Sequence, residues 1–250
     1  MKLTGNTIFI TGGGSGIGRG LAEALHSLGN QVIISGRRKA VLEETTKANP
    51  GMAFVELNIE DPASIAAVAK KLIAEHPKLN VLINNAGIMK PDGVAGVVDD
   101  ALVASIVTTN LLGPIRMTSA LIEHLKKQEA ATVINVTSGL AFVPLAMTAT
   151  YCATKAAMHS YSQSQRYLLK GSNVRVLELA PPYVQTELMG PEMALDPRAM
   201  PLKDFIDETI KVLGTDADEV LVERVGMLRN NPGPNESEFV NKFNDMMAGH

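Results

Sequence analysis

Hydrophobic and polar positions follow two periodicities that alternate along the chain. Short runs rich in β-branched and apolar residues are followed by longer segments in which apolar residues recur at helical spacing. The short runs predict buried strands, and the longer segments predict amphipathic helices. Strands and helices that alternate in this way are typical of a parallel sheet covered by helices on both faces. The pattern therefore predicts an α/β, doubly wound Rossmann-type fold.

The pattern indicates a central parallel sheet of six to seven strands. The expected strands are Thr7–Ile10, Gln31–Ser35, Ala53–Glu56, Val81–Asn84, Thr132–Val136, Arg175–Leu179 and a short seventh at Val220–Val222. The expected helices are Gly16–Leu28, Lys39–Ala48, Pro62–His76, Val98–Leu125, Ala149–Leu169 and Leu202–Leu213. The fourth of these helices should kink near Pro114, because proline cannot donate a helical hydrogen bond.

Neither a linker nor an internal repeat divides the chain, so we expect residues 1–250 to form a single NAD(P)-binding domain. Within it, residues 187–213 begin with an irregular run that is rich in methionine and proline, which is typical of a substrate loop or lid. Ordinary core packing would explain the methionines equally well. Residues 216–250 are acid-rich and predict an appended helical tail with a solvated face.

Composition narrows the possible functions. A chain of 250 residues with 46% hydrophobic content can bury one large core, and a net charge of −3 provides no basic field for nucleic acid. The single cysteine, Cys152, excludes an internal disulfide, and no His/Cys cluster has the spacing of a metal site. No apolar stretch is long enough to span a bilayer, so we expect a cytoplasmic protein without a membrane partner.

A glycine-rich turn follows the first expected strand. Thr11–Gly18 contains Gly12, Gly16 and Gly18 in the spacing Gly-x-x-x-Gly-x-Gly, directly before a helical pattern. Glycines let the backbone turn tightly and approach a pyrophosphate, whose charge the free N–H groups at a helix N-terminus can hold. The spacing departs from the usual Gly-x-Gly-x-x-Gly fingerprint. Its position between strand and helix still predicts a dinucleotide site.

Tyr151 and Lys155 are the candidate catalytic pair. They are four residues apart in an expected helix and therefore lie on one face, one turn apart. A tyrosine has a pKa of about 10, but a nearby ammonium group together with a cationic nicotinamide would favour its phenolate. The same spacing occurs by chance in many proteins, so the pair indicates a catalytic site only together with other features of the chain. Polar or glycine-rich segments follow the other expected strands, and such strand ends meet at one cleft.

These motifs, taken together and in order, resemble the short-chain dehydrogenase/reductase family from about Thr7 to Thr186. The resemblance rests on the glycine turn Thr11–Gly18, the run Asn84-Asn85-Ala86-Gly87, and Asn110, Ser138, Tyr151 and Lys155. Within the family, the stretches Val136–Pro144 and Tyr151–Ser160 are similar to bacterial oxidoreductases of the DltE type. The family implies an NAD(P)-dependent enzyme that moves a hydride between nicotinamide and a carbonyl or secondary alcohol.

The resemblance also implies a role for each matching residue. Tyr151 would exchange a proton with the substrate oxygen, which Ser138 would bind. Lys155 would hold the nicotinamide ribose and tune Tyr151, and Asn110 would hold a water linking Lys155 to solvent. The expected cofactor-binding residues are Gly12, Gly14, Ser15, Gly16, Ile17, Gly18, Arg37, Arg38, Asn58, Ile59, Asn84, Ala86, Gly87, Tyr151, Lys155, Pro181, Val184 and Thr186.

Cofactor choice depends on the end of the second strand. An acidic residue there would bind the ribose hydroxyls of NAD and repel a 2′-phosphate. This chain has Gly36-Arg37-Arg38 instead, so we expect that no carboxylate is available at this end, and Arg37 offers a guanidinium to a phosphate. The alternative is that Arg37 is an ordinary surface residue. The segment predicts NADP(H) in preference to NAD(H).

Two other classes of function stay open. A non-catalytic NADP-binding sensor would not need Ser138, Tyr151 and Lys155, and an interaction protein would act through the acidic tail. His124, His159 and Cys152 have no partners of the kind a hydrolase triad needs. Long helices with apolar residues on several sides, and the family resemblance, predict a homodimer or homotetramer. We expect a small-molecule carbonyl or alcohol substrate, whose identity the loops decide.

Overall fold

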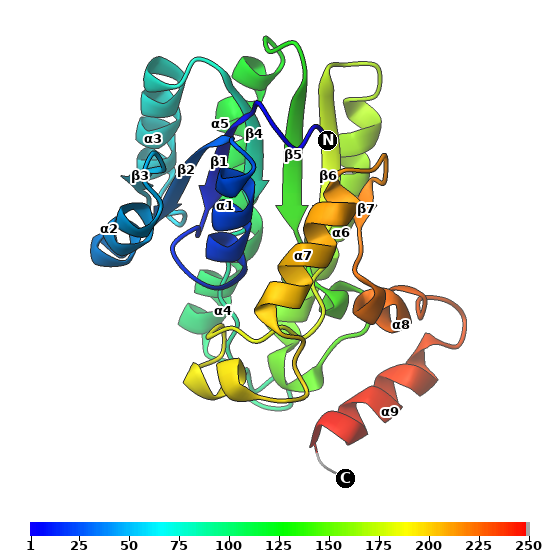
Figure 1. Ribbon diagram of the computed structural model, residues 1–250. Helices are drawn as coiled ribbons and strands as arrows, with labels where there is room; N and C mark the ends of the chain where they lie inside the picture. Colours follow the sequence, from blue (N-terminus) through cyan, green and yellow to red (C-terminus); the bar gives the residue numbers. More distant parts are fainter. Residues whose placement is uncertain (249–250) are drawn as a thin grey trace.

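A sheet of seven parallel strands is the centre of the computed structural model, which describes residues 1–248 (Figure 1). The strand order is β3-β2-β1-β4-β5-β6-β7, so the direction of winding reverses between β1 and β4, as in a doubly wound fold. Their bounds are β1 (Thr7–Thr11), β2 (Gln31–Gly36), β3 (Ala53–Glu56), β4 (Leu79–Asn84), β5 (Ala131–Val136), β6 (Val174–Leu179) and β7 (Glu219–Val220). The predicted fold class is confirmed. The seventh strand begins one residue before the predicted start at Val220 and ends there, because Leu221 and Val222 leave the ladder.

Helices cover both faces of the sheet, each over its own apolar core. One core contains Leu25 of α1 and Phe205 of α7, and the other contains Leu72 of α3 and Leu121 of α5. In Figure 1, α1 and α7 lie in front of the sheet. The helices are α1 (Gly16–Ser27), α2 (Lys39–Ala48), α3 (Pro62–Glu75), α4 (Asp100–Val107), α5 (Gly113–Leu125), α6 (Ala149–Leu168), α7 (Leu202–Leu213), α8 (Gly226–Arg229) and α9 (Glu236–Ala248).

The helix expected over Val98–Leu125 contains a π-helical turn instead of a simple kink. Helices α4 and α5 are joined by the π-helical segment Thr108–Leu112, directly before Pro114. Proline has no N–H to donate to the carbonyl of Asn110, four residues earlier, so the regular ladder is broken there. Single π turns within helices are frequent at functional sites, and this one contains a predicted catalytic residue.

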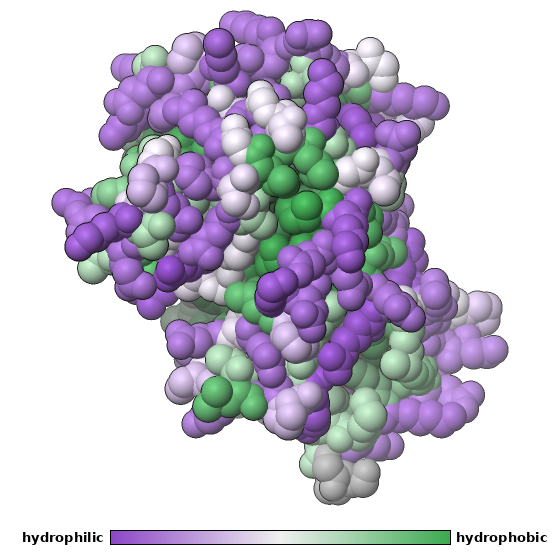
Figure 2. Space-filling view, viewed as in Figure 1, coloured by the Kyte–Doolittle hydropathy of each residue, from purple (hydrophilic) through white to green (hydrophobic). Residues whose placement is uncertain are grey.

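Two irregular segments lie at the carboxyl ends of the strands. The segment after β6 forms an isolated bridge between Val184 and Met200 and a short 3-10 helix, Pro191–Leu195. The tail continues through α8 to α9, which lies at the bottom of Figure 1, on the side of the sheet where the strands end. The face seen in Figure 2 is mainly hydrophilic, and some hydrophobic residues are exposed at its bottom end. Across residues 1–248, no helix is long and apolar enough to cross a membrane.

Candidate active site

A cavity of about 950 Å³ opens along the carboxyl ends of the strands. Its volume is at the upper end of the usual range for small-molecule and cofactor sites. It runs from the glycine turn and the end of β2, past β4 and β5, to α6 and the segment after β6. The sequence prediction that these strand ends share one cleft is confirmed by this lining.

The glycine turn is packed so tightly at Gly12 and Gly18 that a side chain would not fit at either position. Gly12 has a φ of +67°, and a Cβ atom there would lie 2.9 Å from the Cα of Ala86. A Cβ at Gly18 would lie 2.3 Å from the carbonyl oxygen of Gly12. Among the described residues, no side chain caps the N-terminus of α1, so its first N–H groups are available to an anion. The turn therefore fits a pyrophosphate.

Asn85 holds this turn in place, a role that the sequence did not reveal. Its side-chain amide donates to the carbonyl oxygens of Thr11 and Gly12 at 3.0 and 3.1 Å. The Thr11 hydroxyl in turn accepts from the backbone N–H groups of Asn85 and Ala86, both at 3.0 Å. These bonds join the end of β1 to the end of β4. Two adjacent asparagines look equivalent in the sequence, so no local signal indicates which one binds the turn.

Ser138, Tyr151 and Lys155 lie together at the far end of the cavity. Ser138 follows β5, and the other two side chains come from α6, where they are 6% and 4% exposed. Burial raises the pKa of Tyr151 to about 12, and a hydrogen bond with Ser138 opposes this rise. Burial lowers the pKa of Lys155 to about 8. Desolvation is thus the largest cause of the pKa shifts of Tyr151 and Lys155.

In the protein alone, burial rather than Lys155 dominates the pKa of Tyr151, and the lowering of this pKa by Lys155 together with a cationic nicotinamide stays a prediction. The Nζ of Lys155 donates to the carbonyl oxygen of Val136 at 2.9 Å and lies 5.5 Å from the centroid of the Tyr151 ring. Desolvation of the phenol is the larger effect on its pKa. The protein's own groups therefore keep Tyr151 protonated, as a proton donor must be.

Asn110 is buried, and its side chain bonds to neighbouring segments. Its Oδ1 accepts from the N–H of Ile88 at 2.9 Å, and its Nδ2 donates to the carbonyl oxygen of Ile88 and to Thr154. A Cβ at Gly87 would lie 3.4 Å from Asn110 Oδ1 and 3.7 Å from Lys155 Nζ. Asn110 and Lys155 therefore both lie close to Gly87, and Asn110 fixes the segment after β4 through Ile88.

The other end of the cavity is open and charged. Arg37 and Arg38 line it at the end of β2, and the Arg37 side chain is 61% exposed. Arg37 Nη1 lies 3.6 Å from an oxygen of Glu60, and Arg38 lies 3.5 Å from the Ser15 hydroxyl. Glu60 corrects the view that this end lacks a carboxylate. It was missed because it follows β3, whose end the sheet brings beside β2.

Two residues expected at the cofactor are not among those that line the cavity. Asn58 is exposed and accepts from the N–H of Glu60 within a turn. Asn84 is 3% exposed and donates to Thr118 and Asn135, so it joins β4, β5 and α5 inside the fold. The remaining predicted cofactor residues line the cavity: Gly12, Gly14, Ser15, Gly16, Ile17, Gly18, Arg37, Arg38, Ile59, Ala86, Gly87, Tyr151, Lys155, Pro181, Val184 and Thr186.

The segment after β6 closes the cavity opposite the glycine turn. The Pro181 carbonyl accepts from the N–H of Gly139 at 2.8 Å, which ties this segment to the residues after β5. A Cβ at Gly16 would lie 3.5 Å from Thr186, so the turn and this segment face each other closely. Pro182 also lines the cavity and has no N–H to offer a ligand.

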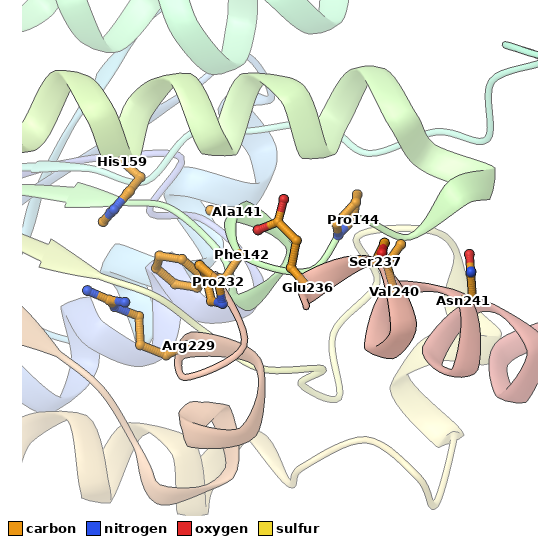
Figure 3. Close-up of a pocket in the computed structure, with 10 residues that line it drawn as sticks. All are labelled: Ala141, Phe142, Pro144, His159, Arg229, Pro232, Glu236, Ser237, Val240 and Asn241. Carbon is orange, nitrogen blue, oxygen red and sulfur yellow. The ribbon is translucent and has the colours of Figure 1, made fainter. Parts of the chain in front are cut away.

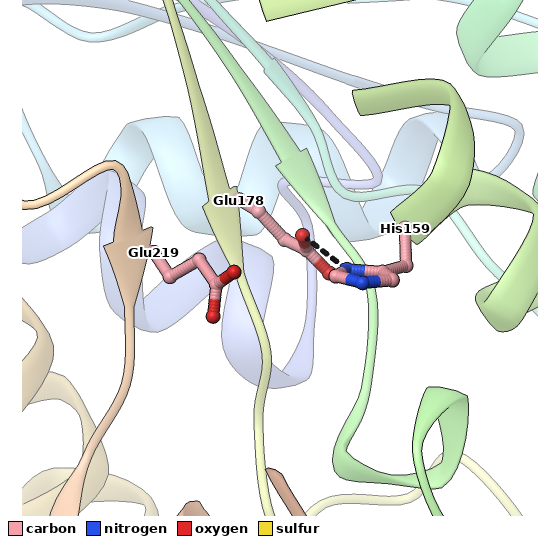
Figure 4. Close-up of side chains that lie close together, drawn as sticks. All are labelled: His159, Glu178 and Glu219. Atoms are coloured by element: carbon pink, nitrogen blue, oxygen red, sulfur yellow. Dashed lines mark hydrogen bonds and ion pairs between the residues drawn. The ribbon is translucent and has the colours of Figure 1, made fainter. Parts of the chain in front are cut away.

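A charged network adjoins the residues between β5 and Ser138. The Glu178 carboxylate accepts from Thr137, the neighbour of Ser138, and from His159, both at 2.7 Å. Glu219 lies beside them (Figure 4), and its carboxylate is paired with Arg229 at 2.7 Å. His159, Glu178 and Glu219 could together hold a metal ion by proximity. Because Thr137, His159 and Arg229 already bond to the two carboxylates, we assign the cluster a structural role.

Comparisons with known proteins agree with this geometry. Residues 6–195 match the family model described as short chain dehydrogenase. The chain is 38% identical over 234 residues to the uncharacterized oxidoreductase DltE of Bacillus subtilis, covering 92% of this chain and 93% of that protein. It is 31% identical to an NADP-dependent 3-hydroxy acid dehydrogenase of Schizosaccharomyces pombe, covering 74% of each.

Solved structures show the same fold. A short chain dehydrogenase from Burkholderia cenocepacia in complex with NADP has a TM-score of 0.84 at 26% identity, covering 97% of this chain and 98% of the other. A 3-ketoacyl-(acyl-carrier-protein) reductase from Brucella melitensis, complexed with NADH, has a TM-score of 0.81 at 26% identity and covers 90% and 99%. The chain belongs to the short-chain dehydrogenase/reductase family of NAD(P)-dependent oxidoreductases.

Proposed function

We propose that this protein is an NADP(H)-dependent reductase of ketones or aldehydes in which Tyr151 is the general acid. One observation carries the proposal: Ser138, Tyr151 and Lys155 are buried at one end of a cavity that is also lined by the glycine turn. A non-catalytic sensor would have no use for a buried, protonated phenol next to a hydroxyl. In the reverse direction the same groups would serve an alcohol dehydrogenase.

The residues that line the cavity fit a dinucleotide along its whole length. The N-terminus of α1 would bind the pyrophosphate, and Val184 and Thr186 would lie beside the carboxamide. Lys155 would hold the nicotinamide ribose next to Tyr151. When bound, the reduced nicotinamide supplies the hydride that the carbonyl carbon accepts.

The protein's contribution is to hold the carbonyl oxygen and provide its proton. Ser138 donates a hydrogen bond to that oxygen, and Tyr151 transfers its phenolic proton to it as the carbon accepts the hydride. Charge on the resulting phenolate is stabilised by Lys155, whose ammonium lies nearby. A proton from solvent then restores Tyr151, and we propose that a water held near Asn110 and Lys155 carries it.

At the open end of the cavity, two arginines would select the cofactor by binding its 2′-phosphate. Arg37 and Arg38 present two guanidinium groups there, and a 2′-phosphate would offer them a better partner than a neutral ribose hydroxyl. The Glu60 carboxylate competes with the phosphate for Arg37 only in part, because it also accepts a hydrogen bond from the Thr109 hydroxyl at 2.7 Å. We therefore propose a preference for NADPH over NADH.

We also propose that the protein works as a homodimer or homotetramer. Tyr167 and Leu168 at the end of α6 are 75% and 80% exposed, which leaves apolar surface for a second copy. Light scattering at micromolar concentration should give a multiple of the 26.6 kDa chain mass. A monomer mass would contradict this assembly.

The experiment that tests the function is NADPH oxidation in the presence of a panel of carbonyl compounds. Aryl ketones, keto esters, keto sugars and acyl ketones differ in size and polarity around the same reacting group. Turnover of at least one class, lost in Tyr151→Phe, would support the proposal. NADPH binding without turnover of any class would favour the sensor.

A further inference from the structure

Glu178 is a buried carboxylate that the proposed reaction does not use. It lies on β6 between Leu177 and Leu179 and is 0% exposed. Taking a carboxylate out of water costs free energy, and buried ion pairs can often be replaced by apolar residues without loss of stability. The stability of the fold therefore does not by itself account for a carboxylate at this position. Its hydrogen-bond partners indicate another role.

One oxygen of Glu178 holds the residue between two contacts of the catalytic site. The Thr137 hydroxyl donates to Glu178 Oε1 at 2.7 Å. The residue before Thr137 is Val136, whose carbonyl oxygen accepts from Lys155, and the residue after it is Ser138. Thr137 is among the residues that line the active-site cavity, and Glu178 is not. Glu178 can therefore influence the reacting groups through Thr137, without touching a ligand.

The other oxygen of Glu178 holds the catalytic helix. His159 Nδ1 donates to Glu178 Oε2 at 2.7 Å (Figure 4). His159 follows Lys155 by four residues on α6, so the two side chains lie on one face of the helix, one turn apart. A single carboxylate thus bridges the segment that leads to Ser138 and the helix that carries Tyr151 and Lys155.

The imidazole of His159 is itself held by its neighbours. Its Nε2 lies 2.6 Å from the amide nitrogen of Gln163, and its ring meets the Phe142 ring edge-on, with centroids 4.9 Å apart. The Arg229 guanidinium lies 4.8 Å from the centroid of the Phe142 ring. His159, Phe142 and Arg229 together line one side of a second cavity, of about 550 Å³ (Figure 3). The imidazole therefore has little freedom, and its bond to Glu178 fixes α6 relative to β6.

Backbone bonds fix the segment after β5 to the sheet and leave its separation from α6 to side chains. The N–H of Thr137 donates to the carbonyl oxygen of Leu179 at 2.8 Å, which joins this segment to β6. Lys155 provides one contact from α6, at the carbonyl of Val136, and Glu178 provides another. Lys155 is also the proposed partner of the nicotinamide ribose. The bridge through Glu178 is the contact of these two that serves position alone.

We propose that Glu178 is a positioning residue that sets the distance between Ser138 and Tyr151. It acts through its bonds to Thr137 and His159. The proposal rests on the proposed function, in which Ser138 and Tyr151 bind the same carbonyl oxygen. Misplacing a group by about 1 Å can lower a rate on the order of 100-fold, so partial loosening of the bridge should lower kcat. KM for the carbonyl should change less, because the hydrogen bond from Ser138 matters most as charge develops on the oxygen.

Threonine variants test the first bond of the bridge. Thr137→Val removes the hydroxyl and keeps the shape of the side chain, and we expect kcat to fall about tenfold. KM for the carbonyl and Kd for NADPH should stay within about threefold of their original values. Thr137→Ser keeps the hydroxyl and should restore most of kcat. Thr132→Val, at a buried threonine of β5, is the matched control and should leave kcat unchanged. Expressing kcat per molecule of NADPH bound removes the effect of any unfolded fraction.

Variants of Glu178 separate reach from charge. Glu178→Asp keeps the carboxylate but is shorter by one methylene, so it cannot meet Thr137 and His159 at once. Its kcat should fall about as far as that of Thr137→Val. Glu178→Gln keeps the length and can still bond to both neighbours, so it should retain more of kcat. The opposite order of the two variants would show that charge acts here instead of position, and would overturn the proposal.

The last measurement repeats Thr137→Val in a Ser138→Ala background. If Thr137 acts through Ser138, the second substitution should lower the residual kcat by less than about twofold. A further loss of about tenfold would show that Thr137 acts elsewhere, and this result would overturn the proposal. A Thr137→Val protein with unchanged kcat would do the same. If the unmodified protein bound NADPH but reduced no carbonyl compound, the proposed function would fail, and the inference with it.

Discussion

The two ends of the cavity differ in burial, and this difference separates chemistry from cofactor choice. At one end, Tyr151 and Lys155 are almost fully buried, and desolvation raises the pKa of Tyr151 and lowers that of Lys155. At the other end, the Arg37 side chain is 61% exposed and shares a surface ion pair with Glu60. Buried groups interact strongly and are insensitive to salt, whereas exposed ion pairs are weak and screened.

We expect the buried Lys155 ammonium to destabilise the fold, and the substitution Lys155→Met should reveal this effect. The Lys155 pKa of about 8, against its usual 10.5, corresponds to roughly 3 kcal/mol. Because the folded-state pKa is depressed, the unfolded chain binds the proton more tightly, and the wild type gains stability as pH rises from about 8 to 10.5. Chemical unfolding of the cofactor-free protein should therefore show a more stable Lys155→Met variant at about pH 7, with a smaller difference at about pH 10.

The exposed lysine Lys47 provides the control for this measurement. Lys47→Met should change the free energy of unfolding little at either pH. A Lys155→Met variant that was less stable than wild type at neutral pH would mean that the bond from Lys155 to the Val136 carbonyl outweighs the desolvation of the ammonium.

At the exposed end, Arg37→Asp should reverse the cofactor preference. Loss of a charge-assisted contact of about 1.5–3 kcal/mol corresponds to about ten- to a hundredfold in affinity for NADPH. The effect should appear as a higher KM for NADPH with a similar kcat, since Arg37 is far from the reacting carbon. Added salt should weaken binding of NADPH more than binding of NADH in the wild type. If Arg37→Asp left the ratio of the affinities for NADPH and NADH unchanged, then Arg38 or the glycine turn would determine the cofactor preference.

Glu60→Gln should produce a smaller change in the opposite direction. The carboxylate lies 3.6 Å from Arg37, so removing its charge frees the guanidinium for a phosphate. We expect NADPH affinity to rise a few-fold, roughly in line with a surface ion pair worth at most about 1 kcal/mol, with little change for NADH. Glu129→Gln, at an exposed carboxylate before β5, should leave both affinities as they are. A fall in NADPH affinity would show that Glu60 holds Arg37 in its binding position.

Sequence reasoning succeeded where the position of a side chain follows from local spacing. The four-residue spacing of Tyr151 and Lys155 and the glycines before α1 predicted which side chains share the cavity, because helices and tight turns are set by near neighbours. It failed where the sheet joins distant segments. The contact between Glu60 and Arg37 depends on the strand order of the sheet. The packing of α9 against the loop between Ser138 and Tyr151 depends on the course of the tail. No local pattern in the sequence encodes either contact.

Asn84 and Asn85 illustrate the same limit at one position. Adjacent residues at the end of β4 have opposite surroundings, because side chains along a strand alternate between its two faces. Asn84 faces the buried network with Asn135, and Asn85 faces the glycine turn. The sequence identified the motif, and the structure was needed to assign its two amides.

The most direct test of the proposed function compares kcat with the Kd for NADPH in Tyr151→Phe. The variant removes one buried hydroxyl and keeps the ring, so the pyrophosphate and phosphate ends of the cavity should be unaffected. We expect kcat with a reduced carbonyl substrate to fall by about 10²–10⁴-fold, while the Kd from NADPH fluorescence changes less than about threefold. A Tyr151→Phe protein that retained near-wild-type kcat would contradict the assignment of Tyr151 as the proton donor.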